Sequence, residues 1–225
     1  MGAPPAAASR DLCWHLFSRQ AAALEFADSL SPERHAHVWS VEQEEHGGKR
    51  SYIVANREAF WCRYRKMLPH SRHHYEIIRE ATPCHLYFDL EYCMAANPHS
   101  DGEAMVRTLC EEIRIALGNC YFDGRCPHCS IVDLDSTTAL KFSRHLIVRV
   151  SGAAFCDNTH VGSFVRDVLA SLQKRGDDEP LVAALFVAPK ASKDPRKPSA
   201  ARVCFVDTSV YTRNRCFRLC TLPTY

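Results

Sequence analysis

The sequence predicts an α+β fold in which mixed sheets are flanked by helices, with an N-terminal αβ module ahead of the larger part of the chain. Two observations predict it. From Cys84 onward, segments with strand-like and helix-like patterns alternate. Two of the helix-like segments carry apolar residues at helical spacing, whereas the short runs between them are rich in β-branched and aromatic residues.

The first 80 residues divide into a tail and a small module. Residues 1–11 are low-complexity and rich in Ala and Pro, so we expect them to be disordered. Residues 12–80 form the N-terminal αβ module. Its expected elements are a helix over 12–30, strands at 38–41 and 52–54 around a Gly47-Gly48 turn, a helix over 58–67 and a strand at 75–78.

Residues 81–225 form the second module. Ser100 to Glu103 has the form of a capping box, and Gly118 stands where a helix C-cap belongs, so the pattern predicts a helix between them. The other expected elements are strands at 84–92, 140–150 and 202–212, a helix over 161–172, and a mobile, basic, proline-rich linker at about 188–201.

Composition excludes several classes of protein. The net charge is +2, from 28 Lys and Arg against 26 Asp and Glu, so any nucleic-acid contact must come from a local patch. The sequence has neither an apolar run that could span a bilayer nor a secretory signal, and we expect no membrane partner.

The cysteines indicate a reducing compartment. The 12 cysteines are scattered, and we expect most, including Cys62 and Cys156, to be buried thiols. Cys126 and Cys129 form an isolated C-x-x-C pair. A structural zinc site needs four ligands, so we do not interpret this pair as one.

Two carboxylates stand out in the segment 85–92. Asp89 and Glu91 are two residues apart in a run that is typical of a strand, so they share one face while Leu86, Phe88 and Leu90 take the other. Neighbouring carboxylates repel each other unless a cation lies between them, and hard divalent ions such as Mg²⁺ or Mn²⁺ prefer oxygen ligands. The alternative is a solvated strand face with two acids.

A second polar strand face follows the same period of two. Lys141, Ser143 and His145 share one face, and Phe142 lies on the other. A charge and two hydrogen-bonding groups in a row suit a phosphate group. The alternative is again a solvent-exposed face.

Asp207 follows Phe205 and Val206 in a predicted apolar strand, where a lone carboxylate is costly unless it is paired or binds a metal. Arg213, Arg215 and Arg218 come next, and arginine matches phosphate geometry, although a solvated turn is the alternative. The three carboxylates and these donors together indicate two-metal chemistry on a nucleoside triphosphate. The chain has no Walker-type glycine loop, so phosphate binding would depend on side chains.

Three motifs carry a resemblance to a known family. The segments 86–91 (LYFDLE), 141–147 (KFSRHLI) and 206–219 resemble, in order, the three catalytic motifs of eukaryotic primase-polymerases, in the archaeo-eukaryotic primase superfamily. Shorter segments at 16–21, 75–78, 134–137 and 157–162 are also similar, so the resemblance covers nearly all of residues 12–220. It implies a primase-like catalytic core.

The resemblance also implies roles for individual residues. It makes Asp89, Glu91 and Asp207 the catalytic ligands of two Mg²⁺ or Mn²⁺ ions. It assigns nucleotide binding to Lys141, Ser143, His145, Arg215, Arg218, Arg50 and Tyr75, with Tyr75 near the incoming sugar. It assigns template contacts to Arg19 and Gln20.

The implied activity is that of a DNA-directed primase and polymerase, a nucleotidyltransferase of DNA damage tolerance and replication restart. Its implied partners are template DNA, a primer, an NTP or dNTP, and a single-stranded-DNA-binding protein. The resemblance also implies a monomer in the nucleus and the mitochondrial matrix.

The chain departs from the family at its C-terminus. The family continues with further strands of the catalytic module and a zinc-binding Cys/His module, and a family lysine after the arginine cluster has no counterpart in 219–225. We therefore expect a truncated core that lacks the zinc module. Two alternatives stay open: an inactive nucleotide- or DNA-binding fragment, and a two-metal phosphodiesterase.

Overall fold

The computed structural model describes residues 14–43, 49–176, 178–189 and 201–219. They divide into two compact units: the first contains the described residues up to Ile78 and those from Cys216 onward, and the second contains Arg79–Arg215. The expected disordered tail at 1–11, the Gly47-Gly48 turn and nearly all of the expected 188–201 linker lie outside the described residues.

The first unit is built on an antiparallel sheet with the strand order β1-β3-β2-β4-β10. Its strands are β1 (Trp14–Phe17), β2 (Ala36–Glu42), β3 (Arg50–Asn56), β4 (His74–Ile78) and β10 (Arg215–Arg218). Its helices are α1 (Gln20–Ser29) and α2 (Arg57–Tyr64), with short 3-10 turns at Pro32–Arg34 and Pro69–Ser71.

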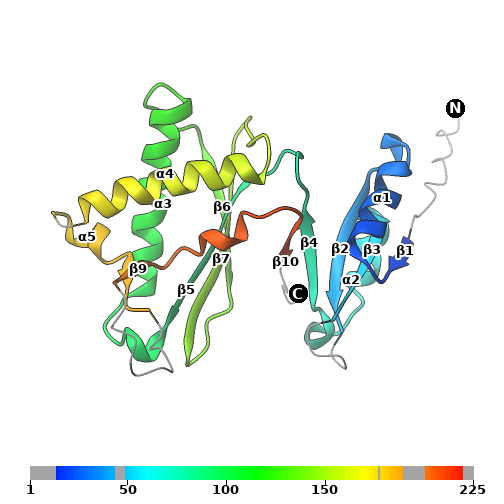
Figure 1. Ribbon diagram of the computed structural model, residues 1–225, viewed down its shortest axis with the longest axis horizontal. Helices are drawn as coiled ribbons and strands as arrows, with labels where there is room; N and C mark the ends of the chain where they lie inside the picture. The colour runs from blue at the N-terminus through cyan, green and yellow to red at the C-terminus, as the bar shows by residue number, and fades with distance from the viewer. Residues whose placement is uncertain (1–13, 44–48, 177, 190–200, 220–225) are drawn as a thin grey trace, which may run out of the picture. The chain divides into compact units, whose positions relative to one another are not determined.

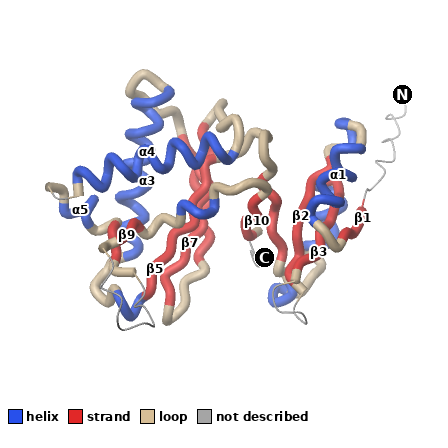
Figure 2. Tube along the Cα trace, viewed as in Figure 1, coloured by secondary structure: helices blue, strands red, loops and turns tan. Residues whose placement is uncertain are grey.

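The two helices of this unit cover opposite faces of its sheet. Adjacent strand residues point to opposite sides. Accordingly, Val38 packs in the cluster with Ala23 and Ala27 of α1, while Trp39 packs in the cluster with Phe60 of α2. The rings of Trp39 and Phe60 stack with their centroids 4.0 Å apart. Figure 2 shows α1 lying along β2 and β3.

The second unit contains a three-stranded antiparallel sheet of order β5-β7-β6 and a two-stranded β8-β9 pair. Its strands are β5 (Leu86–Cys93), β6 (Cys129–Asp135), β7 (Lys141–Val150), β8 (Phe186–Val187) and β9 (Val203–Cys204). Its helices are α3 (Gly102–Tyr121), α4 (Asn158–Arg175) and α5 (Pro180–Ala183), with 3-10 turns at Met94–Ala96 and Thr208–Val210.

Helices α3 and α4 cross each other beside the β5-β7-β6 sheet (Figure 1). Phe88 and Leu90 of β5 are almost completely buried, whereas Asp89 and Glu91, which alternate with them along the strand, remain partly accessible. A side chain at Gly102 would collide with the ring of Phe142, so α3 begins directly against β7. The sheet therefore has an apolar face in the core and a polar face available for a ligand.

The α+β class is confirmed, but several elements differ from the predictions. The expected helix over 12–30 begins only at Gln20, because Trp14–Phe17 pairs with β3 as an edge strand. Trp14 and Phe17 are three residues apart, a spacing that fits one face of a helix; in the strand they point to opposite sides, toward the clusters of Phe60 and Ala23 respectively. The pattern could not reveal the available sheet edge.

The boundaries of α3 also differ. Asp101, not Ser100, is the N-cap, because its carboxylate accepts a hydrogen bond from the Ala104 N–H at 3.0 Å. Gly118 lies inside the helix rather than at its C-cap. A Cβ at Gly118 would come within 3.0 Å of the Cys126 backbone nitrogen, so this glycine permits close approach of the following loop.

Other differences concern the second half of the chain. The expected strand over 202–212 is only the two-residue β9, followed by a 3-10 turn, while β6 and β10 were not expected. The segment from Cys216 onward was predicted to belong to the second module, but it lies in the first unit because β10 pairs beside β4. Cys62 and Cys156 are exposed rather than buried.

Among the described residues, none of the helices has the length and apolar character that crossing a bilayer requires.

Candidate functional site

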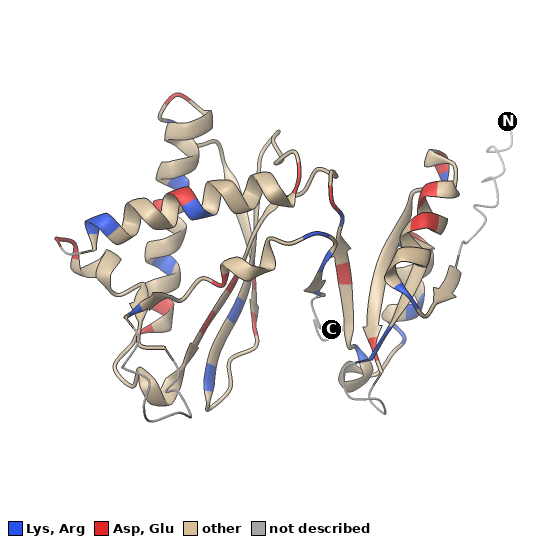
Figure 3. Cartoon of the chain, viewed as in Figure 1, with Lys and Arg blue, Asp and Glu red and all other residues tan. Residues whose placement is uncertain are grey.

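The polar face of the second unit begins with the register of β5 and β7. Asp89 lies directly across from His145, and Glu91 lies directly across from Ser143. His145 Nε2 is 3.3 Å from Asp89 Oδ1, and Lys141 Nζ forms an ion pair with Glu91 Oε2. The two motifs that the sequence placed on separate strands are therefore paired in register, with the carboxylates of β5 opposite the polar residues of β7. Figure 3 shows the acidic positions of β5 next to basic positions of β7.

Asp207 reaches this surface from the other edge of β5. Leu90 and Val206 form an antiparallel bridge, the Asp207 N–H donates to the Asp89 carbonyl at 2.8 Å, and the Glu91 N–H donates to the Phe205 carbonyl at 2.8 Å. This pairing sets Asp207 opposite Asp89. Asp207 was expected inside a long strand; instead its carboxylate caps the 3-10 turn by accepting from the Ser209 N–H at 2.8 Å.

Two tyrosines hold the Asp207 segment against β5. The Tyr211 hydroxyl donates to the Tyr87 carbonyl at 2.7 Å, and the Tyr87 hydroxyl donates to the Val210 carbonyl at 3.2 Å. Burial raises the pKa of both phenols well above the usual value, so both hydroxyls keep the protons that they donate. Sequence reasoning missed these residues, although Tyr87 is two positions before Asp89 and therefore on the same strand face.

Arg144 anchors β7 from the opposite side. Its side chain is 14% exposed and forms ion pairs with Glu103 of α3 and with Asp133 and Asp135 of β6, the latter two at 2.8 and 3.2 Å. Because Arg144 lies between Ser143 and His145 in the chain, these pairs fix the strand that carries both side chains. No sequence motif pointed to Arg144 as a site residue, because its partners lie on α3 and β6.

The carboxylates are suited to a hard divalent cation. Asp89 Oδ1 is buried, and no hydrogen bond to it is found among the described residues. Its nearest polar partner is His145 Nε2 at 3.3 Å, and the Asp207 segment pairs with the Asp89 segment, so a cation would stabilise this carboxylate. In the described part of the chain, however, no group of three or more His, Cys, Asp or Glu side chains lies close enough together to hold a metal ion. Glu91 is engaged by Lys141, and Asp207 by Ser209.

The first unit has its own cationic cluster, which contains three of the predicted nucleotide-binding residues. The Arg50 guanidinium lies over the Tyr75 ring, 4.5 Å from its centroid, and Arg218 Nη2 donates to the Tyr75 hydroxyl at 3.0 Å. The hydroxyl in turn donates to Glu42 Oε2 at 2.8 Å. Glu42, which the sequence analysis missed, therefore fixes the position of Tyr75.

The remaining predicted binding residues are Arg19 and Gln20, at the start of α1, and Arg215. Arg19 is the exposed N-cap residue of α1, and Gln20 is the first residue of that helix. Phe17 pairs with Tyr52, so α1 begins at the end of the sheet that carries Arg50. Arg215 is the first residue of β10 but belongs to the second unit, whose last residue it is, and its charge opposes the rise in the pKa of Tyr87. Arg213, by contrast, pairs with Glu80 at 2.6 Å.

The second unit thus presents a polar face on an α+β scaffold, with carboxylates for a divalent cation and donors for phosphate oxygens. This arrangement defines a candidate site for a polyphosphate ligand.

Three curated proteins named DNA-directed primase/polymerase protein are similar to this chain. The Danio rerio protein is 35% identical over 92% of this chain and 42% of its own length, and the Mus musculus protein is 35% identical over 92% and 43%. The Homo sapiens protein is 42% identical over 69% of this chain and 27% of its own length.

The chain is therefore a homologue of the DNA-directed primase/polymerase proteins, and the resemblance to the primase-polymerase family is confirmed. The chain spans less than half of the length of these relatives. No protein-family model matches the chain.

Proposed function

We propose that this chain is the catalytic core of a DNA-directed primase-polymerase. It would transfer a nucleotide from an NTP or dNTP to a primer 3′-hydroxyl or to an initiating nucleotide, on a DNA template. The observation that carries the proposal is the β5–β7 register, which sets Asp89 across from His145 and Glu91 across from Ser143, with Asp207 beside Asp89. The names of the homologues support the same activity.

Each group on the polar face has a part in this reaction. Lys141, Ser143 and His145 would bind the oxygens of the triphosphate by charge-assisted hydrogen bonds. Asp89, Glu91 and Asp207 would hold Mg²⁺ or Mn²⁺, which supplies charge stabilisation for the attacking and leaving oxygens. The 3′-hydroxyl would lose its proton to solvent as its oxygen attacks the α-phosphorus in line, the bond from that phosphorus to the bridging oxygen would break, and pyrophosphate would leave.

Lys141 has a further role in the absence of a ligand. Its ion pair with Glu91 is half-exposed and therefore weak, so both groups can exchange partners at little cost. We propose that Lys141 turns from the carboxylate to the phosphate when a nucleotide binds, which also releases Glu91 toward the cation.

The cluster of the first unit would act on the nucleotide and the template. Arg50 and Arg218 would contact the nucleotide, and the ring of Tyr75 would lie near the incoming sugar. Arg19 and Gln20 would contact the template at the start of α1. Further proposed partners are the primer and a single-stranded-DNA-binding protein. The proposed setting is DNA damage tolerance and replication restart, in the nucleus and mitochondrion.

An inactive nucleotide- or DNA-binding fragment is the second candidate. The observation that favours it is the ion pair between Lys141 and Glu91, which occupies one of the three carboxylates. Such a fragment would bind triphosphates and leave primers unchanged.

Primer extension with Mn²⁺ separates these functions. The chain is incubated with a labelled primer on a DNA template and dNTPs, next to the double variant Asp89→Ala/Glu91→Ala and a control, Asp167→Asn, which changes an exposed acid on α4. We expect extension by the chain and the control but not by the double variant. Nucleotide binding without extension by the intact chain would support the fragment. Carboxylate-dependent cleavage of DNA without nucleotides would support a phosphodiesterase.

A further inference from the structure

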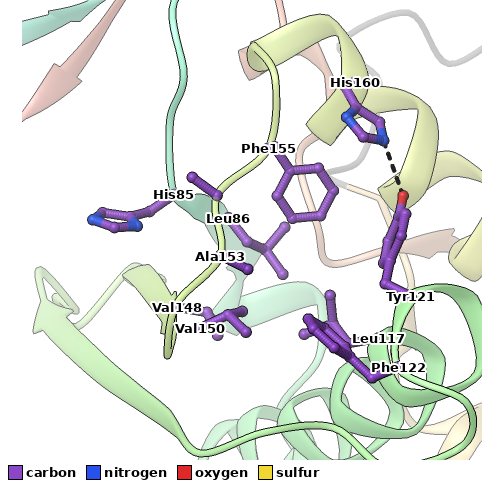
Figure 4. Close-up of a pocket in the computed structure, with 11 residues that line it drawn as sticks. His85, Leu86, Leu117, Tyr121, Phe122, Val148, Val150, Ala153, Phe155 and His160 are labelled. Atoms are coloured by element: carbon purple, nitrogen blue, oxygen red, sulfur yellow. Dashed lines mark hydrogen bonds between the residues drawn. The ribbon is translucent and has the colours of Figure 1, made fainter.

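An apolar pocket lies in the second unit, on the core side of the strands that carry the candidate site (Figure 4). Its volume is about 220 Å³. Leu86 of β5 and Val148 of β7, which pair in register, lie on one side of it, and Leu117 of α3 lies on another. These three side chains are at most 3% exposed. The pocket has no part in the chemistry proposed above.

Aromatic rings form much of the remaining wall. Figure 4 shows Phe155, Tyr121 and Phe122 around the pocket, with His160 at one side. The centroids of the Phe155 and Tyr121 rings are 5.8 Å apart and the rings are nearly perpendicular. None of the lining residues is Asp, Glu, Lys or Arg. The ionisable side chains of the lining are Tyr121, His160, which is hydrogen-bonded to Tyr121, and His85, which lies at the exposed mouth. The lining therefore carries no permanent charge, and it favours a neutral ligand.

One polar group interrupts the apolar wall. The Tyr121 hydroxyl and His160 Nε2 are 3.0 Å apart, and His160 Nδ1 accepts from the Cys156 N–H at 3.4 Å. In a neutral imidazole one nitrogen accepts and the other donates. Nε2 therefore donates to the Tyr121 oxygen, and the phenolic proton is left to donate elsewhere. Within the described residues, this hydroxyl has no second hydrogen-bond partner.

The size of the pocket and of its mouth decides between kinds of occupant. A cavity of about 150 Å³ lined by apolar side chains accepts benzene, so a somewhat larger one suits two fused rings. At the mouth, Tyr121 is the one large apolar residue that is exposed, beside His85, Ala153 and Ala154. A protein partner would need a broader apolar rim than this.

We propose that this pocket binds a small, neutral, bicyclic heteroaromatic molecule whose ring nitrogen accepts a hydrogen bond from Tyr121. The ligand would lie against Leu86 and Val148, on the reverse side of the strands that hold Asp89 and His145. The proposal does not depend on the catalytic function, because it rests on a different cavity with its own lining.

Quinoline is the probe, and naphthalene is its match in shape without the ring nitrogen. Binding to the full chain is followed by ligand-detected NMR at a pH where quinoline is neutral. We expect saturable quinoline binding with a dissociation constant of about 1 mM or lower. We also expect several-fold weaker binding of naphthalene, and none of the anion quinoline-2-carboxylate.

Two variants locate the site. Ala153→Phe should fill the pocket from its exposed edge and weaken quinoline binding about tenfold or more, as expected when a ligand loses most of its buried surface. Leu181→Phe enlarges an exposed residue of α5 outside the pocket and should leave binding unchanged. Tyr121→Phe keeps the ring and should reduce the affinity for quinoline to that for naphthalene.

Three results would overturn the proposal: no saturable binding of quinoline, undiminished binding to Ala153→Phe, or equal affinity of the intact chain for quinoline and naphthalene. The aromatic proton resonances of Tyr121 and Phe155 give a test that needs no variant, because they must shift as quinoline is added. Resonances that stay in place while quinoline binds would place the ligand elsewhere and would also contradict the proposal.

Discussion

Asp89 and Asp207 lie opposite each other on antiparallel backbone segments, joined by a hydrogen bond of 2.8 Å from the Asp207 N–H to the Asp89 carbonyl. Like charges that face each other across a strand pair destabilise the fold. The chain keeps both in place with a capped turn and with the hydrogen bonds between Tyr87 and the 210–211 segment. A cation bound between the two carboxylates would offset this repulsion.

Neutralising Asp207 should therefore raise the stability of the chain in metal-free buffer and weaken the binding of a divalent cation. Asp207→Asn keeps an oxygen that can accept from the Ser209 N–H, so the turn stays capped. Without divalent ions we expect the variant to be more stable by about 0.5 kcal/mol, because the repulsion from Asp89 is gone. Denaturant unfolding with and without Mn²⁺ measures this. Asp167→Asn is the control, and a loss of stability in metal-free buffer would contradict the account.

Ser143 and His145 should contribute to nucleotide binding rather than to folding. Ser143→Ala or His145→Gln removes one donor to the triphosphate, and hydrogen bonds to charged groups are each worth about 1.5–3 kcal/mol. We expect dNTP affinity to fall roughly 10- to 100-fold at an unchanged melting temperature. Titration calorimetry in the presence of Mn²⁺ checks this, with Ser130→Ala on the exposed side of β6 as control. Unchanged dNTP affinity in both variants would contradict the proposal that β7 binds the triphosphate.

Glu42 should control how well the cluster of the first unit selects its nucleotide. Glu42→Ala removes the acceptor that fixes the Tyr75 hydroxyl, so the ring gains freedom. We expect the preference for dNTP over NTP in primer extension to fall by about threefold to tenfold, the effect of losing one hydrogen bond. Glu42→Gln keeps an acceptor and should retain most of the preference. Equal selectivity of Glu42→Ala and the unaltered chain would show that Glu42 does not position Tyr75.

Buried His74 should make the stability of the first unit depend on pH. Burial, assisted by the charge of His73, lowers the pKa of His74 to about 4 from its usual 6.5. The unfolded chain therefore binds this proton first, so stability is complete above pH 6.5 and falls as the pH drops toward 4. We expect a loss of about 2 kcal/mol between pH 7 and pH 5 from this residue.

The variant His74→Phe tests that assignment. The His74 ring packs edge-on against Phe60 and Tyr64, so phenylalanine fits the same surroundings. Urea unfolding across this pH range should give a flatter pH profile than that of the unaltered chain. A profile with the same slope would assign the titration to another group.

The sequence was sufficient to predict strand faces and helices where the residue pattern has one clear period. The alternation through Asp89 and Glu91 and through Lys141, Ser143 and His145 predicted both polar faces. The helices α3 and α4 were predicted from their apolar spacing. The register that joins the two faces could not be predicted, because a period of two fixes the face of a strand but not its partner.

The errors occur where long-range pairing decides the local structure. Trp14–Phe17 is a strand only because β3 offers an edge, and Asp207 is next to Asp89 only because Val206 bridges Leu90. Glu42 and Tyr75 meet through adjacent strands of a sheet whose order the sequence does not state. Such contacts join residues that are far apart in the chain, and no local propensity records them.

The binding of Mn²⁺ together with a dNTP tests the central claim most directly. Electron paramagnetic resonance of Mn²⁺, titrated with the chain in the presence of dNTP, counts the bound ions without requiring catalysis. The account predicts that the intact chain and Asp167→Asn bind Mn²⁺ and that Asp89→Asn binds at least about tenfold more weakly, because the loss of a direct ligand should cost no less than the loss of a residue that only supports one. Equal Mn²⁺ binding by Asp89→Asn and the intact chain would contradict it.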